Sequence, residues 1–336
     1  MTATRANLVT ASPPQDRSAP AKRAGRLCPT DYRYSPSVFD RPAELATDVL
    51  YVVGGLYGNL AALDCVERLA AQERATLVFN GDFHWFDAEP AWFAEIEQRI
   101  AGHRGTRGNV ESEVARAHDI GAGCGCAYPA SVAEDVVHRS NEILVELRAT
   151  AQDLPDATQR LAALPMHLVA EVGGLRIGIV HGDASALAGW SFADEAFAEP
   201  SALAALDAVR KTARIDVFAS THTCLAVLRD LCLPAGRTTI VNNGAAGMPN
   251  FSASRFGLVS RIATTPSPHP PLYGMVRNGV HIDAIPLDYD SEAFLARFRA
   301  RWPEGSAAHA SYFQRIMVGP DYSVAQAMPQ STTRGG

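Results

Sequence analysis

Four polar side chains that could bind a metal ion follow short apolar runs of this sequence: Asp82, Asn109, His181 and His222. Each lies within a few residues of a glycine or at the end of a run that resembles a buried strand. Carboxylate, amide oxygen and imidazole together suit a divalent first-row metal such as Zn, Mn or Fe. Singly, such residues are more often turn caps, helix caps or hydrogen-bonded core residues. The presence of four such residues, each at the end of a predicted strand, favours a metal site.

The run around Asp82 shows how such a residue is positioned. Residues 77–79 are apolar, and Asn, Gly and Asp follow at once. This pattern predicts a buried strand that ends in a turn with a carboxylate at its carboxyl end. In open α/β sheets, ligands bind just beyond the carboxyl ends of the strands. We therefore place Asp82 at the centre of the predicted site.

Other residues are candidate additional ligands. His84 and Asp87 follow Asp82 closely, and either could turn into the same cleft, although His84 could equally pack on Trp85 at the surface. Cys124 and Cys126 lie in a glycine-rich stretch, and two thiols could bind a metal or be redox-active. The alternative, which we favour, is a tight loop that needs small residues, because alternate residues of an extended loop face opposite ways.

The elements that must hold these residues alternate between strand and helix. The strand at 48–53 leads to a helix from Leu60, with Asn59 as its N-cap, and the strand at 77–79 leads to a helix containing Trp92. This order predicts a parallel sheet with crossover helices. Two apolar runs around Gly173-Gly174 predict a β-hairpin over 167–180, and the second half of the chain is rich in strands.

At this point the chain resembles the calcineurin-like metallophosphoesterase family over roughly residues 48–290. Gly81-Asp82 is similar to its GD motif and Gly108-Asn109-Val110-Glu111 to its GNH(D/E) motif. His181-Gly182 and the segment ending in His222 match its two later histidine motifs. The resemblance implies a four-layer αββα sandwich of two mixed β-sheets flanked by helices. It also implies a two-metal centre in which Asp82 bridges both ions, Asn109 and His181 bind the second, and His222 binds the first.

The chain departs from the family pattern at four positions. Gly55 and Tyr57 replace the first Asp and His of the family, Val110 replaces the catalytic His, and Ser220 replaces the first His of the GHTH motif. The first metal would keep only Asp82 and His222 as ligands. The second would keep Asp82, Asn109 and His181. A single ion with open coordination positions is still a catalytic arrangement.

The sequence thus supports two functions. The first is a metal-dependent phosphoesterase, a hydrolase of phosphate mono- or diesters. It would use one or two divalent ions (Mn, Fe or Zn), and its metal centre, which has fewer ligands than that of the family, could be mononuclear. Its catalytic residues would be Asp82, Asn109 and His181, and its substrate a small phosphorylated molecule. The second is a catalytically inactive protein of the same fold that binds a phosphorylated ligand or a protein partner.

Composition sets outer limits on these functions. The chain has 336 residues, 47% of them apolar, and a formal net charge of -6, which argues against a broad nucleic-acid or anionic-membrane surface. No run is long enough to span a bilayer, the N-terminus lacks the apolar core of a secretory signal, and six cysteines in so long a chain are not a disulfide framework. We expect a cytoplasmic protein with a disordered tail at 1–46, one metallophosphoesterase-like domain at 47–302, and an extension at 303–336 that frays at its end.

Overall fold

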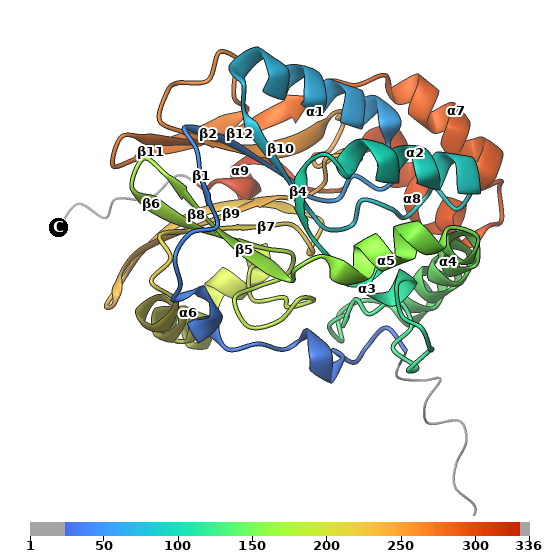
Figure 1. The fold of residues 1–336 in the computed structure, drawn as a ribbon, viewed down its shortest axis with the longest axis horizontal. Helices are drawn as coiled ribbons and strands as arrows, with labels where there is room; N and C mark the ends of the chain where they lie inside the picture. Colours follow the sequence, from blue (N-terminus) through green and yellow to red (C-terminus); the bar gives the residue numbers. More distant parts are fainter. Residues whose placement is uncertain (1–23, 330–336) are drawn as a thin grey trace, which may run out of the picture.

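The computed structural model describes residues 24–329, and residues 1–23 and 330–336 lie outside the described part of the chain. Two six-stranded mixed sheets pack face to face, and helices cover their outer faces (Figure 1). The predicted four-layer αββα sandwich is therefore confirmed.

One sheet has the strand order β11-β12-β10-β2-β3-β4. Its strands are β2 (Val49–Val53), β3 (Thr76–Asn80), β4 (Arg104–Thr106), β10 (Gly257–Ala263), β11 (Tyr273–Arg277) and β12 (Val280–Leu287). The strands β2, β3 and β4 are parallel, as the strand–helix alternation predicted. The other sheet has the order β1-β5-β6-β7-β9-β8. Its strands are β1 (Leu45–Ala46), β5 (His167–Val172), β6 (Leu175–Val180), β7 (Val217–Ser220), β8 (Ala226–Leu233) and β9 (Gly236–Asn243).

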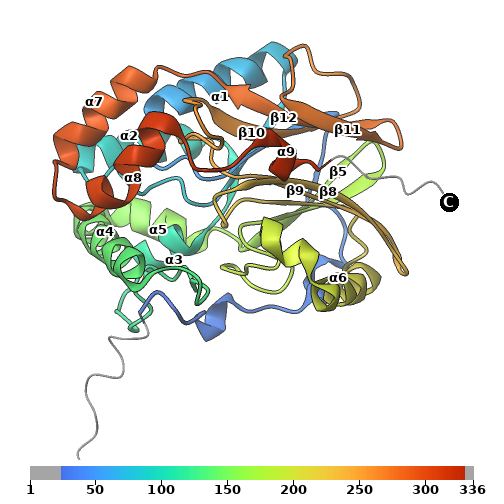
Figure 2. The ribbon, with the colours of Figure 1, turned by 180° about the vertical axis from the view of Figure 1, so that it is seen from behind.

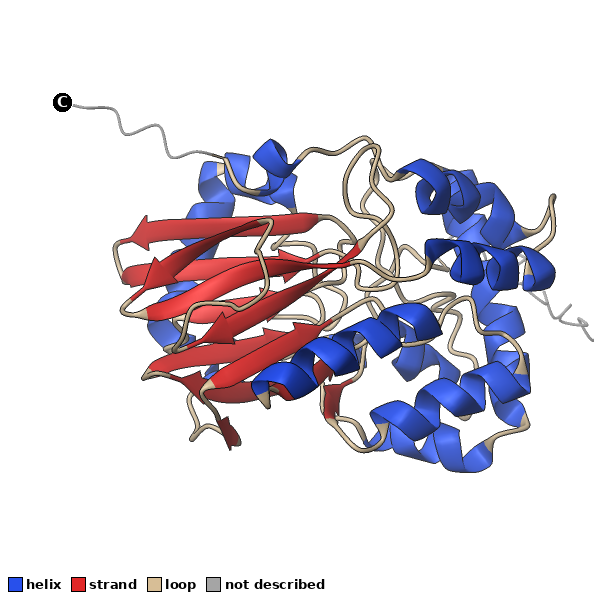
Figure 3. Ribbon diagram, turned by 90° about the horizontal axis from the view of Figure 1, so that it is seen from above, coloured by secondary structure: helices blue, strands red, loops and turns tan. Residues whose placement is uncertain are grey.

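The predicted hairpin is the antiparallel pair β5–β6, whereas β6, β7 and β9 are parallel neighbours. The carboxyl ends of β3, β6 and β7 therefore reach the same edge of the sandwich. Figure 3 shows that the strands gather at one side of the molecule and pass into a region of loops before the helices at the other side.

Alternating residues of the central strands divide the core. Leu50 and Val52 point between the two sheets, where they pack with Ile177 and Val217 of the other sheet. Tyr51 and Val53 point to the opposite face, beneath the helices. This period-two division is what a strand buried on both faces produces, and it explains why the run 48–53 is apolar throughout.

Helices cover the outer face of each sheet (Figures 1 and 2). The sheet containing β2 is covered by α1 (Leu60–Glu73), α2 (Pro90–Ile100) and α7 (Ser291–Arg301). The other sheet is covered by α6 (Pro200–Ala213). The remaining α-helices are α3 (Asn109–Val114), α4 (Glu134–Gln152), α5 (Pro155–Ala163), α8 (Ala307–Val318) and α9 (Val324–Ala327). The N-cap prediction for α1 is confirmed, because the Asn59 side chain accepts a hydrogen bond from the Ala62 amide at 3.0 Å.

The prediction of a disordered tail over 1–46 was wrong for residues 24–46, which pack on the body. They contain two short 3-10 helices, η2 (Thr30–Tyr32) and η3 (Pro36–Phe39), and β1 pairs with β5. Tyr32 is buried, and its hydroxyl donates to the Glu113 carboxylate at 2.6 Å. A few buried aromatic anchors hold this segment without any hydrophobic periodicity.

The segment after residue 302 also belongs to the body. Helix α8 packs against α4, and Ala327 of α9 is buried (Figure 2). Between residues 24 and 329, no helix combines the length and apolar character needed to cross a bilayer.

Candidate metal centre

The turn after β3 brings the two sheets together at the site. The Asn80 side-chain amide donates to the backbone oxygen of Val180, at the end of β6, at 2.7 Å. Gly81 follows with φ of +76°, and a Cβ there would lie 2.6 Å from Nδ1 of His181. Only glycine permits so close an approach of the strand end to the imidazole.

Glu111 fixes the position of Asp82. Its carboxylate accepts hydrogen bonds from the backbone amides of Asp82 and Phe83, both at 2.9 Å, and of Gly108 at 2.7 Å. The turn after β3 is thereby tied to the start of α3, where Asn109 is the first helical residue. Burial and the nearby charge of Asp82 raise the pKa of Glu111.

Each of the two imidazoles at the site has one nitrogen against a backbone carbonyl. Nδ1 of His181 lies 2.9 Å from the Asn80 oxygen, and Nε2 of His222 lies 3.0 Å from the Cys126 oxygen. A carbonyl oxygen can only accept, so these two nitrogens carry the protons in the neutral rings. The remaining nitrogens, Nε2 of His181 and Nδ1 of His222, are left as lone pairs, yet they face each other at 3.1 Å.

Two further acceptor atoms point to the same place. The Asn109 amide nitrogen donates to the Cys124 oxygen at 2.9 Å, which turns its Oδ1 toward His181 Nε2, 3.1 Å away. Asp82 Oδ1 lies 3.4 Å from the same nitrogen and is buried without a hydrogen-bond partner among the described residues. Acceptor atoms of Asp82, Asn109 and His222 therefore gather around Nε2 of His181.

The distances from His181 Nε2 to the other three acceptors are compatible with binding to one metal ion. Two ligand atoms that are each about 2.1 Å from an ion lie about 3.0–3.4 Å apart at angles between a right angle and the tetrahedral angle. The three distances from His181 Nε2 to the other acceptors, 3.1, 3.1 and 3.4 Å, fall in this interval. A backbone carbonyl behind a ligating imidazole is also the usual arrangement in metal proteins.

Among the described residues, side chains of His, Cys, Asp and Glu do not form a metal site without Asn109. Within residues 24–329, no group of three or more His, Cys, Asp or Glu side chains is placed to hold a metal ion. The Asn109 amide oxygen would therefore have to complete the ligand set. Such a set fits one divalent ion better than two.

Burial controls ionisation here. It raises the pKa of Asp82 to about 7. Burial also lowers the pKa of His181, and together with the neighbouring His181 it lowers the pKa of His222 to about 3. Both imidazoles are thus neutral near pH 7, the form in which histidine binds a metal.

The structure does not bring His84 or Asp87 to these four residues. The His84 ring is buried and stacks on Phe93, with Nδ1 at 2.6 Å from Asp87 and Nε2 at 3.0 Å from Glu97. The other Asp87 oxygen accepts the Trp85 amide at 3.0 Å. His84 and Asp87 thus satisfy each other within the core, and the structure gives neither the geometry of a ligand.

The glycine-rich loop contributes through its backbone. The carbonyls of Cys124 and Cys126 accept from Asn109 and from His222, as described above, and the Cys126 carbonyl also faces Trp190 Nε1 at 3.0 Å. The Cys126 thiol lines the site cavity and lies 3.4 Å from the Asn109 amide nitrogen, whereas the Cys124 thiol does not line it. Cys124 and Cys126 are free thiols, as are the other four cysteines. The loop orients the predicted ligands, and Cys124 has no position from which its sulfur could join them.

The four departures from the family pattern are all buried at or beside the site. The Tyr57 side chain occupies the space above Gly55, and its hydroxyl lies 3.0 Å from the Cys224 sulfur. Val110 lines the site cavity, and Ser220 Oγ is buried with no partner among the described residues. The Tyr57 ring therefore fills the space that a side chain at position 55 would need.

A cavity of about 220 Å³ opens onto the acceptor cluster, as we call the acceptor atoms of Asp82, Asn109, His181 and His222. Asp82, Asn109 and His222 form part of its wall, and five aromatic side chains form another part. Arg315 of α8 is the lining residue with a fixed positive charge. Neither Arg315 nor the aromatic residues Tyr128, Trp190 and Tyr312 were identified as site residues from the sequence. The helical spacing of Ala308, Tyr312 and Ile316 was the one available signal for α8.

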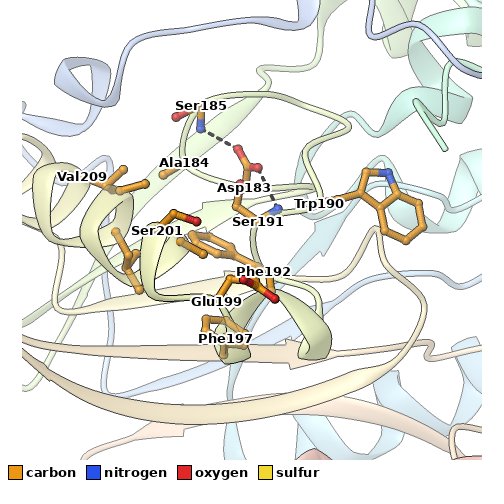
Figure 4. A pocket seen from close by; sticks show the side chains of 14 residues that line it. Asp183, Ala184, Ser185, Trp190, Ser191, Phe192, Phe197, Glu199, Ser201 and Val209 are labelled. Carbon is orange, nitrogen blue, oxygen red and sulfur yellow. Dashed lines mark hydrogen bonds between the residues drawn. The ribbon is translucent and has the colours of Figure 1, made fainter. Parts of the chain in front are cut away.

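A second cavity, of about 480 Å³, lies between α6 and the loop that follows β6 (Figure 4). Both Asp183 oxygens accept backbone amides there, from Ser185 at 2.8 Å and from Ser191 at 3.1 Å, so this carboxylate has a structural role. Trp190 lines both cavities and separates them.

Comparisons with known proteins identify solved structures with a similar fold. No family model matches the chain, and no curated protein matches it. A hypothetical protein from Pyrococcus horikoshii is similar in structure, with a TM-score of 0.53, 14% identity, and coverage of 83% of this chain and 100% of that one. A metallophosphoesterase from Sphaerobacter thermophilus gives a TM-score of 0.50 at 14% identity, with coverage of 81% and 100%. The chain thus has the metallophosphoesterase fold that the motifs indicated.

Proposed function

We propose that this protein is a metal-dependent phosphoesterase whose centre holds one divalent ion through Asp82, Asn109, His181 and His222. The observation that carries the proposal is the contact between two lone pairs, His181 Nε2 and His222 Nδ1, at 3.1 Å. Two neutral acceptors at this distance repel each other unless a cation lies between them and the neighbouring oxygens. The metallophosphoesterase-like fold supports the reaction class.

A bound ion would polarise a phosphoryl oxygen and lower the pKa of a water molecule toward neutrality. The protein supplies the rest of the site. Glu111 holds the Asp82 turn in place, and the backbone carbonyls of Asn80 and Cys126 orient the two imidazoles. Arg315 provides a positive charge in the cavity against which a phosphate ester can bind.

The first test is metal binding by the purified full-length protein. Calorimetric titration of the metal-stripped protein with Mn²⁺, Fe²⁺ or Zn²⁺ should give a stoichiometry near one. His222→Ala should weaken binding by at least about 100-fold, since even outer-sphere changes cost 10–100-fold. His103→Ala, at an exposed histidine, should leave the affinity unchanged. A protein that binds none of the three ions would contradict the proposal.

The second test is turnover. The metal-loaded protein is assayed against a panel of phosphate mono- and diesters with aryl and alkyl leaving groups, and hydrolysis of at least one class is expected. The alternative function, an inactive protein of this fold that binds a phosphorylated ligand, is favoured by the Tyr57 ring above Gly55 and by the apolar Val110 in the cavity. Tight metal binding with no turnover of any ester would support that alternative.

A further inference from the structure

The cavity in front of the acceptor cluster is aromatic and small. Its walls include the rings of Tyr57, Trp85, Tyr128, Trp190 and Tyr312. Its volume, about 220 Å³, is below the roughly 300–1,000 Å³ of pockets that hold drug-sized ligands. Such walls favour a single flat ring.

Arg315 is positioned to bind an anion in this cavity. Its Nη2 donates to the Cys224 oxygen at 2.6 Å and its Nε to the Pro249 oxygen at 3.3 Å, which fixes the guanidinium. Among residues 24–329 no carboxylate forms an ion pair with Arg315. Other arginines that pack on the folded domain do pair with a carboxylate, for example Arg99, Arg116 and Arg261. Arg315 is the one cationic side chain among the described residues that line the cavity, and a fixed guanidinium suits a phosphate group.

We propose that the substrate of this site is the phosphate monoester of a small phenol. This inference rests on the proposed phosphoesterase function. In the reaction a water oxygen forms a bond to phosphorus, and the bond between phosphorus and the aryl oxygen breaks with its electron pair on that oxygen. One water proton passes to solvent, the phenolate takes a proton from solvent, and the products are a phenol and inorganic phosphate. The aromatic wall binds the ring, and Arg315 binds the phosphate oxygens.

The kinetic test compares leaving groups of matched size in the metal-loaded full-length protein. Phenyl phosphate and cyclohexyl phosphate have rings of similar size but differ in leaving-group basicity. The expected result is kcat/KM at least about 10-fold higher for phenyl phosphate, because the aromatic walls of the cavity pack against a flat ring better than against a puckered one. Equal hydrolysis of the phenyl and cyclohexyl esters would overturn the inference and leave the phosphoesterase function standing.

A binding test does not depend on turnover. Trp85 and Trp190 line the cavity, so their fluorescence should report binding of phenylphosphonate, a non-hydrolysable probe. Phenylphosphonate should bind at least about 10-fold more tightly than methylphosphonate, and Arg315→Gln should remove that binding while Arg315→Lys retains part of it. Arg255→Gln is the matched control, because Arg255 also bonds a backbone carbonyl, that of Met317, but is paired with Glu292 and lies outside the cavity lining.

The two tests separate the two proposals. If phenylphosphonate binds as expected but no ester is hydrolysed, the phosphoesterase function fails and the ligand class stands. If phenylphosphonate and methylphosphonate bind equally well, or Arg315→Gln binds phenylphosphonate as the unmodified protein does, the inference about the cavity is wrong.

Discussion

The Tyr57 ring lies directly above the α-carbon of Gly55, so that a Cβ on Gly55 would be 2.9 Å from the Tyr57 hydroxyl oxygen. Gly55 also has φ of +63°, a conformation that other residues adopt only with strain. These are the two positions at which the resembling family has its first Asp and His. The glycine and the tyrosine are therefore a matched pair, and replacing either alone creates a steric conflict or an empty space.

We expect Gly55→Asp alone to destabilise the protein by about 1–3 kcal/mol through overpacking, in addition to the cost of the positive φ. The double variant Gly55→Asp, Tyr57→His should regain stability, because the smaller imidazole lacks the hydroxyl that the new side chain would meet. It should also bind a second metal ion beside Asp82. Urea unfolding and metal analysis by mass spectrometry measure the two effects.

Gly174→Asp is the control for this series, since Gly174 has φ of +79° and open space where its Cβ would be. It carries the backbone strain without the clash. If Gly55→Asp cost no more than Gly174→Asp, the packing of Tyr57 on Gly55 would not be what excludes the carboxylate.

Asp82→Asn should abolish tight metal binding while the fold survives. Asn tolerates the left-handed conformation of this residue, whose φ is +52°. Because burial raises the pKa of Asp82 from 3.8 to about 7, the metal-free protein loses stability as the pH rises from about 4, and the loss is complete above about 7. We therefore expect the variant in EDTA at pH 8 to melt a few degrees higher than the unmodified protein.

Asp183→Asn is the control variant, and its expected effects on stability and metal affinity are opposite to those of Asp82→Asn. Its two carboxylate oxygens accept backbone amides outside the cluster, so this variant should lose stability and keep its metal affinity. A lower melting temperature of Asp82→Asn in EDTA, or unchanged metal affinity, would contradict the assigned function of Asp82.

The acceptor cluster could be predicted from sequence because local patterns determine it. An apolar run followed by a glycine and a polar residue predicts both a strand and its carboxyl end, and parallel strands bring those ends to one edge. Asp82, His181 and His222 were found in this way. The pattern could not show that the His84 side chain turns into the core, because that depends on Glu97 of α2, whose position is set by tertiary packing.

The cavity could not be predicted in the same way. Tyr312 and Arg315 reach it only because α8 packs against α4, more than 150 residues earlier in the chain. Tyr32 docks the N-terminal segment through one buried hydroxyl, a contact with no periodic signal in the sequence. Long-range docking of short segments thus accounts for what the sequence did not reveal.

His84→Gln should destabilise the protein in a pH-dependent manner. Burial disfavours the charged imidazolium, but Asp87 and Glu97 outweigh burial and raise the pKa of His84 from 6.5 to about 10. Its stabilising contribution is therefore complete below about pH 6.5 and is lost as the pH rises through about 10. At pH 6.5 we expect a loss of about 3–5 kcal/mol, since two buried carboxylates lose their partner.

The measurement for His84 is the free energy of unfolding in urea at several pH values between 6 and 10. The difference between His84→Gln and the unmodified protein should narrow toward the alkaline end. His138→Gln, at an exposed histidine, should show no such trend. A difference that stays constant across this range would mean that His84 is neutral in the folded protein.

Arg261→Met should cost about 3–5 kcal/mol, although the residue is far in sequence from the site residues. Arg261 on β10 is fully buried and pairs with Glu73 of α1 and with Asp283 of β12, at 3.1 Å for the latter. Removing the guanidinium leaves two buried carboxylates without a counter-charge.

The triple variant with Glu73→Gln and Asp283→Asn should recover most of the loss, because uncharged amides need no counter-charge. Arg237→Met, which breaks an exposed pair with Asp230, should cost at most about 1 kcal/mol in the same urea titration. If Arg261→Met cost no more than Arg237→Met, the three charges would not be what joins α1 to the sheet.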